Sequence, residues 1–141
     1  MTVYFSYGAN MDPVHMAKEC PGATRIGPAI LEGYRFGIAR AGYGTARPDA
    51  GSMIRGVLWR LTAGDEAALD RFEGVAEGLY YKSTLPVRNA TGNREAMLYR
   101  ASDPAPGTPV AGYLERIIEV AESLDFPSGY IEELRALLGP R

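Results

Sequence analysis

Apolar residues alternate with polar ones, or run together in short stretches, over the first two thirds of the chain, a pattern typical of β-strands. The pattern predicts strands at residues 3–6, 24–31, 34–40, 53–61, 79–88 and 95–101. We expect Glu32-Gly33 to form the turn between the second and third strands, and residues 90–93 to join the last two. Residues 41–52 are rich in glycine and carry no periodicity, so they are expected to form a surface loop.

Two helices are predicted within this strand-rich part. The first has Asp12 as its N-cap and Pro13 in its first position, and it ends at Pro21-Gly22. Thr62 caps the second, and Gly74 is its expected stop. The inward side of the second helix is expected to comprise Ala68, Leu69 and Phe72.

Helical spacing also marks the last third of the chain. Thr108 is the expected cap and Pro109 the first residue of a third helix, and a fourth is expected to begin at Ser128. Their apolar positions are Tyr113, Ile117, Val120 and Leu124, then Ile131, Leu134 and Leu138. Strands followed by two closing helices predict an α+β fold with a curled or barrel-like mixed β-sheet and flanking helices. A length of 141 residues fits a single domain spanning residues 1–141.

Charge and composition favour a small-molecule partner. The 15 Lys and Arg residues nearly balance the 17 Asp and Glu residues, so the net charge of -2 gives no electrostatic reason to expect nucleic acid or an anionic membrane. The first residues lack signal-peptide features, no apolar run approaches the ~18 residues of a membrane span, and the lone Cys20 cannot form an internal disulfide. A cytoplasmic protein is therefore expected. Apolar groups such as Leu137, expected to be exposed, suggest a possible homodimer.

The scarcity of histidine and cysteine narrows the possible chemistry. His15 is the only histidine and Cys20 the only cysteine, so the usual three or four His and Cys ligands of a zinc site cannot be assembled. A Ser-His-Asp or Cys-His arrangement would have to use His15, which stands on a short predicted helix and is disfavoured for that role. We expect neither a metal nor a cofactor.

Glu73 stands at an electrostatically poor position. It lies at the carboxyl end of the second predicted helix, where backbone carbonyls already present negative partial charge. Its neighbours Phe72 and Val75 are apolar, so partial desolvation would act in the same direction and raise its affinity for a proton. Glu73 is thus a candidate base near neutral pH, although an exposed residue at a fraying helix end is an alternative reading.

The segment Tyr-Phe-Ser-Tyr-Gly-Ala-Asn-Met at residues 4–11 is the second candidate. A glycine-containing turn between a strand and a helix directs several backbone N–H groups into one concavity, which suits a carboxylate or an oxyanion. The alternative is an ordinary turn with buried tyrosines.

These two features together resemble the γ-glutamylcyclotransferases and their AIG2-like relatives. Residues 4–11 resemble that family's Tyr-Phe-Ala-Tyr-Gly-Ser-Asn-Leu segment, and residues 69–80 resemble its Leu-Asp-x-x-Glu-Gly-Val-x-x-Gly-x-Tyr segment. Residues 56–59 and several positions of the last two helices also match, so the resemblance spans nearly the whole chain. It implies the γ-glutamylcyclotransferase-like fold, with Glu73 as the catalytic acid and base. The residues implied to bind substrate are Tyr4, Phe5, Ser6, Tyr7, Gly8, Ala9, Asn10 and Tyr113.

The resemblance implies a cofactor-independent cyclisation of a γ-glutamyl amide or dipeptide to 5-oxoproline, a reaction of glutathione metabolism. A γ-glutamylamine cyclotransferase, an enzyme that deprotects a pathway metabolite, and a non-catalytic AIG2-like binding module remain alternatives. Ala9 departs from the family's serine, and Asn10 argues against the glutathione-specific relatives. Whether Arg40, Arg47 or Tyr130 contacts substrate stays open at this stage.

Overall fold

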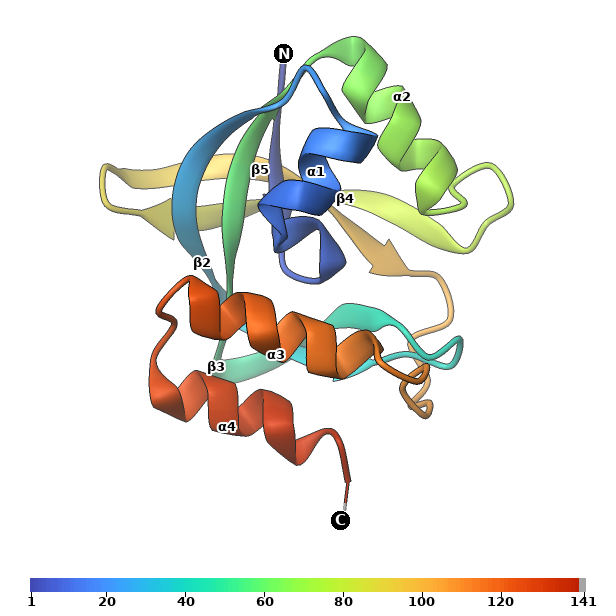
Figure 1. Ribbon diagram of the computed structural model, residues 1–141, viewed down its shortest axis with the longest axis vertical. Helices are drawn as coiled ribbons and strands as arrows, with labels where there is room; N and C mark the ends of the chain where they lie inside the picture. The colour runs from blue at the N-terminus through green and yellow to red at the C-terminus, as the bar shows by residue number, and fades with distance from the viewer. Residues whose placement is uncertain (140–141) are drawn as a thin grey trace.

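Five strands and four α-helices make up the computed structural model, which describes residues 1–139 (Figure 1). The strands are β1 (Thr2–Ser6), β2 (Thr24–Ile38), β3 (Gly44–Leu61), β4 (Tyr80–Asn89) and β5 (Gly92–Ala101). The helices are α1 (Pro13–Glu19), α2 (Ala63–Phe72), α3 (Tyr113–Ser123) and α4 (Ser128–Ala136), and a short 3-10 turn, η1 (Ala9–Met11), precedes α1.

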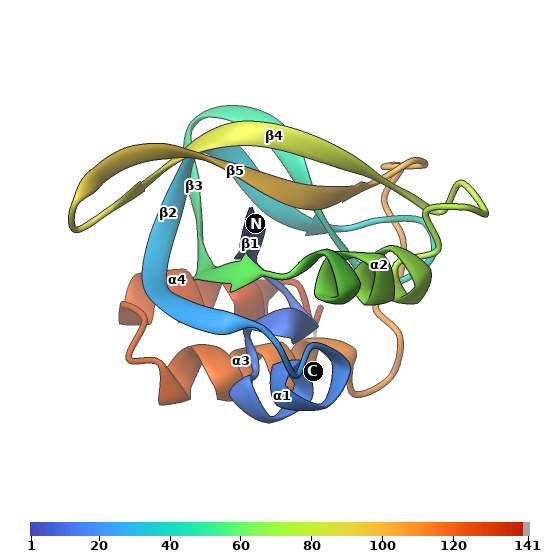
Figure 2. The same cartoon turned by 90° about the horizontal axis from the view of Figure 1, so that it is seen from above.

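The strands close into a barrel in the order β1-β3-β2-β4-β5. All neighbours are antiparallel except β1 and β5, which pair in parallel where Tyr4 meets Met97, so the sheet is mixed. Figure 2 shows α3 and α4 on one side of the molecule and the β4–β5 hairpin across from them. The predicted α+β fold with a barrel-like mixed sheet and flanking helices is confirmed.

The long β2–β3 hairpin differs from the sequence-based expectation. Glu32-Gly33 is not a turn but an irregularity within one continuous strand, where the register shifts and Gly33 takes a φ of +81°. Residues 44–52 are not a loop either, because they belong to β3, and residues 44–48 pair with β2, as Tyr34 opposite Pro48 illustrates. This part of β3 carries small residues and glycines, so its strand character depends on cross-strand pairing and gives no apolar alternation.

The first two helices follow their capping signals. Asp12 accepts a hydrogen bond from the backbone N–H of Val14, and Pro13 is the first residue of α1. In α2, Thr62 and Asp65 form a capping box, each side chain accepting from the other's backbone N–H at 3.1 Å. Phe72 departs from the predicted inward side, because 49% of it stays exposed at the end of α2.

The third helix begins later than predicted. Gly112, not Thr108, is the N-cap of α3, so Pro109 lies in the preceding linker. Two backbone hydrogen bonds attach that linker to the β2–β3 connection, because Gly107 N–H donates to Ile38 O and Val110 N–H donates to Gly42 O. The helix α4 begins at Ser128 as expected. Leu137, expected to be exposed, is instead half-buried against the core. Among residues 1–139, no helix combines the length and apolar character that crossing a bilayer requires.

Replacing Thr62 with alanine should lower the free energy of unfolding by about 1 kcal/mol, because it removes the hydroxyl that accepts from Asp65 N–H and leaves only the backbone half of the capping box. Chemical denaturation measures the change. Thr108→Ala is the matched control, because Thr108 is not the N-cap of α3 in the structure. This variant should change the free energy of unfolding by less than about 0.5 kcal/mol. Equal losses in the two variants would contradict this assignment of caps.

Candidate active site

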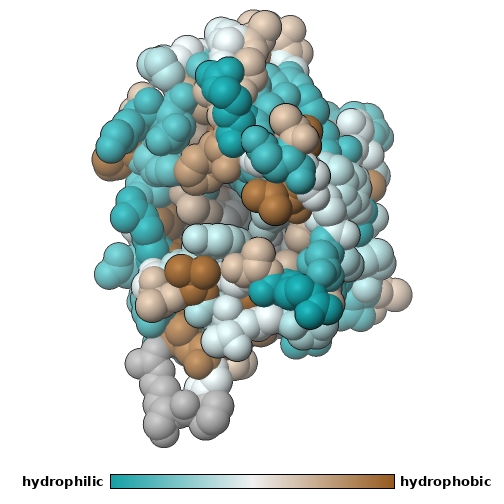
Figure 3. All heavy atoms as spheres, turned by 90° about the vertical axis from the view of Figure 1, so that its right-hand side faces the viewer, coloured by the Kyte–Doolittle hydropathy of each residue, from teal (hydrophilic) through white to brown (hydrophobic). Residues whose placement is uncertain are grey.

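A cavity of about 690 Å³ opens on the face shown in Figure 3, which is hollowed near its centre. Its walls come from the β1–α1 turn, the β2–β3 connection, the segment that follows α2, the end of β5 and the start of α3. Seven of the predicted site residues line it: Tyr4, Tyr7, Gly8, Ala9, Asn10, Glu73 and Tyr113. Segments far apart in the sequence thus meet at one cavity.

Two of the residues expected to bind substrate, Phe5 and Ser6, do not line this cavity. Phe5 is fully buried in the core. Ser6 donates from its hydroxyl to the carbonyl of Val57 and accepts from the indole N–H of Trp59 at 3.0 Å. Both side chains therefore serve packing of the barrel, and the expectation that they bind substrate gains no support from their placement.

The structure also distinguishes among the three residues whose contact with substrate the sequence left undecided. Arg40 lines the mouth of the cavity, where its Nε lies 2.6 Å from a carboxylate oxygen of Asp103. Arg47 lies outside, with its guanidinium donating to the carbonyls of Ile38 and Pro104. Tyr130 is buried outside the cavity beside Phe126. Only Arg40 is placed where a ligand could meet it.

The backbone around Glu73 holds its carboxyl group at the cavity. Glu73 is the C-cap of α2, and its N–H donates to Leu69 O at 2.8 Å. Gly74 then takes a φ of +67°, a left-handed conformation that glycine adopts without strain, and its carbonyl accepts from Leu79 N–H. The chain therefore folds back on itself directly after Glu73. Burial raises the pKa of the Glu73 carboxyl to about 7.

Asn10 links Glu73 to a buried tyrosine. Its amide Nδ2 donates to the hydroxyl of Tyr4 at 2.8 Å and lies 3.5 Å from Oε1 of Glu73. Within residues 1–139, its Oδ1 is buried without a hydrogen-bond partner, so it remains available to accept from a ligand. Burial, reinforced by the nearby Glu73 charge, holds the pKa of Tyr4 well above its usual range, so its hydroxyl keeps a proton to donate.

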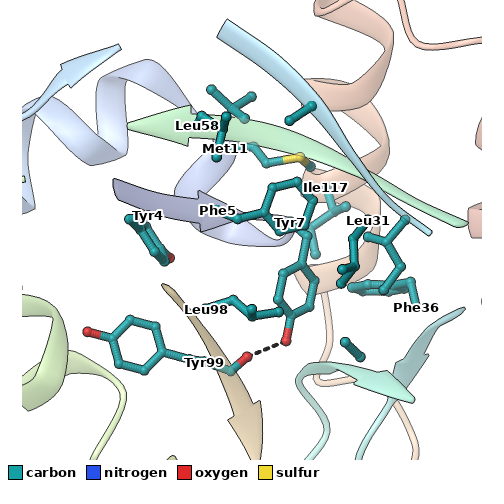
Figure 4. Close-up of a cluster of buried hydrophobic side chains, with 14 of the residues drawn as sticks. Tyr4, Phe5, Tyr7, Met11, Leu31, Phe36, Leu58, Leu98, Tyr99 and Ile117 are labelled. Carbon is teal, nitrogen blue, oxygen red and sulfur yellow. Dashed lines mark hydrogen bonds between the residues drawn. The ribbon is translucent and has the colours of Figure 1, made fainter. Parts of the chain in front are cut away.

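The turn after β1 offers backbone donors. In η1, Met11 N–H donates to Gly8 O and Asp12 N–H donates to Ala9 O. The preceding N–H groups of Gly8, Ala9 and Asn10 donate to no protein group within residues 1–139. The Tyr7 hydroxyl, which donates to the carbonyl of Tyr99, anchors the turn against β5 (Figure 4). Three unpaired donors beside the cavity suit a carboxylate or an oxyanion.

Further tyrosines complete the walls. The hydroxyl of Tyr113 accepts from Gly44 N–H at 2.9 Å, while that of Tyr80 donates to Gly44 O at 2.8 Å. Tyr99 donates to Asp70 at 2.7 Å, and its ring packs edge-on against Tyr4. Sequence reasoning assigned no ligand role to Tyr80 or Tyr99. Tyr80 ends the segment of residues 69–80 that resembles the family's glutamate-containing pattern, and this match could have identified it as a site residue.

Comparison with known proteins agrees with this fold. The AIG2-like family matches residues 53–134, more than half of the chain, so the chain belongs to the AIG2-like family. A γ-glutamylcyclotransferase from Bos taurus is 22% identical over 146 residues, covering 96% of this chain and 78% of that protein.

Two solved structures share the fold closely. A γ-glutamyl cyclotransferase superposes with a TM-score of 0.88 at 22% identity. An uncharacterized human protein does so with a TM-score of 0.88 at 23% identity. Each comparison covers 99% of this chain and 89% of the other. At this identity the likeness establishes the fold.

The raised pKa of Glu73 predicts a pH-dependent contribution to stability. Between its ordinary value of 4.5 and about 7, the folded protein retains a proton that the unfolded chain has released. The free energy of unfolding should therefore fall as pH rises through this window, by up to about 3 kcal/mol for this group. Urea unfolding of the protein and of Glu73→Gln at pH 5, 6, 7 and 8 measures the difference. Parallel stability profiles would contradict the shifted pKa.

Proposed function

We propose that this protein is a γ-glutamyl cyclotransferase that converts a γ-glutamyl amide to 5-oxoproline and a free amine. The observation that carries the proposal is a desolvated carboxyl group, with a pKa of about 7, in the same cavity as three unpaired backbone N–H groups. Membership of the AIG2-like family and the relative named γ-glutamylcyclotransferase support it.

The proposed reaction is intramolecular. The substrate's α-amino nitrogen attacks its own γ-carbonyl carbon, a new C–N bond closes the five-membered lactam, and the original amide C–N bond breaks. Nucleophile and electrophile belong to one molecule, so the protein gains most by holding the γ-glutamyl chain folded. The walls of tyrosine around the cavity would limit the extended conformations of that chain.

Glu73 would move the proton that this reaction must transfer. The α-amino group is protonated near neutral pH, so a base must first remove one proton from the ammonium and a second as the nitrogen attacks. The departing nitrogen needs a proton as it leaves. A carboxyl with a pKa of about 7 is present in both protonation states near neutral pH, so Glu73 would accept a proton and return it. The first proton passes to bulk water, the second passes through Glu73 to the departing nitrogen, and the released amine takes up a proton from bulk water. The protons therefore balance, and no water, electron or further group is consumed.

Fixed dipoles would orient the substrate and stabilise developing charge. The N–H groups of Gly8, Ala9 and Asn10 would bind the substrate's α-carboxylate or the oxyanion formed at the γ-carbon, an interaction worth about 3 to 4 kcal/mol per donor in comparable sites. The buried Oδ1 of Asn10 would accept from the α-ammonium beside Glu73. Because Ala9 contributes only its backbone to this scheme, its departure from serine would leave the reaction intact.

Glu73→Gln should abolish 5-oxoproline formation from γ-glutamyl substrates, since the amide can neither take up nor return the proton. Release of 5-oxoproline, followed by chromatography, is the measurement, and the melting temperature should not fall. Glu77→Gln is the matched control, because Glu77 is an exposed glutamate four residues further on and outside the cavity.

Retained turnover in Glu73→Gln would remove Glu73 from the proposed role. If the unmodified protein binds γ-glutamyl compounds without converting them, the alternative of a non-catalytic AIG2-like binding module is correct.

A further inference from the structure

The solvent exposure of the lining residues increases from a buried end of the cavity to an open mouth. Tyr4 and Asn10, near the Glu73 carboxyl, are 3% and 4% exposed. Three apolar side chains at the mouth are far more accessible: Tyr43 is 44% exposed, Phe72 49% and Leu79 60%. We call these three residues the apolar mouth. Under the proposed function, the γ-glutamyl group occupies the buried end, so the leaving group must extend through the apolar mouth.

Each residue of the apolar mouth is held in place, two by ring packing and one by a backbone hydrogen bond. The ring of Tyr43 packs edge-on against Tyr113 with a centroid distance of 5.1 Å. Phe72 packs against the ring of His15 at 5.3 Å. Leu79 follows the turn closed by the hydrogen bond from its N–H to Gly74 O. Three separate segments therefore present a preformed apolar surface that loses little conformational freedom when a ligand covers it.

Charge at the mouth argues against an anionic leaving group. Among residues 1–139, Arg40 is the only Lys, Arg or His that lines the cavity, and its Nε lies 2.6 Å from Asp103, which also lines it. This exposed pair is weak, but the Asp103 charge offsets that of Arg40. Glu73 adds further negative charge. A carboxylate on the leaving group would thus find no unpaired cation among the described residues that line the cavity.

We propose, on the basis of the proposed function, that this site selects γ-glutamyl amides whose leaving amine is bulky and apolar and carries no carboxylate. The bonds made and broken are those of the cyclisation above, with the apolar amine nitrogen receiving the proton. Burying an aromatic or branched aliphatic group against the apolar mouth supplies the selectivity, because a few added methylene groups in an apolar pocket change kcat/KM by roughly 10- to 200-fold.

Four substrates separate size from charge. The phenethylamide of γ-glutamate differs from γ-glutamyl-phenylalanine only by the carboxylate, and the ethylamide differs from γ-glutamyl-alanine in the same way. We expect kcat/KM for the phenethylamide to exceed that for the ethylamide by about tenfold or more. We also expect each amide to exceed its carboxylate-bearing partner by at least about threefold.

The outcomes distinguish the two proposals. If γ-glutamyl-alanine is the best substrate, or if the carboxylate raises kcat/KM in both pairs, the selectivity is wrong while the cyclotransferase function stands. If none of the four releases 5-oxoproline, the proposed function fails and the selectivity proposal fails with it.

Variants of the mouth test the residues themselves. Leu79→Ser and Phe72→Ser should each lower the ratio of kcat/KM for phenethylamide to that for ethylamide by about threefold, since each removes one part of the apolar mouth. Tyr81→Ser is the matched control, since Tyr81 is 43% exposed on β4 but lies outside the cavity, and the ratio should not change. An unchanged ratio in Leu79→Ser, the more exposed of the two sites and the less demanding for folding, would overturn the proposal.

Discussion

Desolvation of one carboxyl group is the constraint on which the site depends. Glu73 caps the carboxyl end of α2, and the left-handed Gly74 turns the chain away immediately afterwards, so the carboxyl stays beside the cavity instead of facing bulk water. The capping box at Thr62 fixes the residue at which α2 begins. The length of α2 then places Glu73 at its carboxyl end. A carboxyl that solvates freely at this position would keep its ordinary pKa and lose the property that the proposed chemistry uses.

The barrel brings the other groups to that carboxyl. The parallel pairing of β1 with β5 places the Gly8–Asn10 turn next to Tyr99, and the Tyr7 hydrogen bond locks this arrangement. The long β2–β3 hairpin carries Gly44 to the opposite wall, where its N–H and C=O bind the hydroxyls of Tyr113 and Tyr80. Tyrosine rings thus form walls whose polar ends are already paired, which leaves the unpaired backbone donors for a ligand.

Local signals predicted much of this structure, and long-range pairing accounts for most of what they missed. The Asp12 and Thr62 caps and the β4–β5 hairpin are readable within a few residues of sequence, and Glu73 stands out because it opposes the helix dipole. Residues 44–52 were wrongly expected to form a loop because the strand character of residues 44–48 comes from pairing with β2. The inward orientation of Tyr99 likewise depends on register around a closed barrel, which no local pattern specifies.

The structure of a complex with 5-oxoproline, the product of the proposed reaction, tests the central claim most directly. The product should lie in the cavity with its carboxylate or lactam oxygen within hydrogen-bond distance of the Gly8, Ala9 and Asn10 N–H groups. Its ring nitrogen should approach the Glu73 carboxyl. A product bound at another surface, or bound in this cavity with its oxygens turned away from that turn and its ring remote from Glu73, would contradict the account.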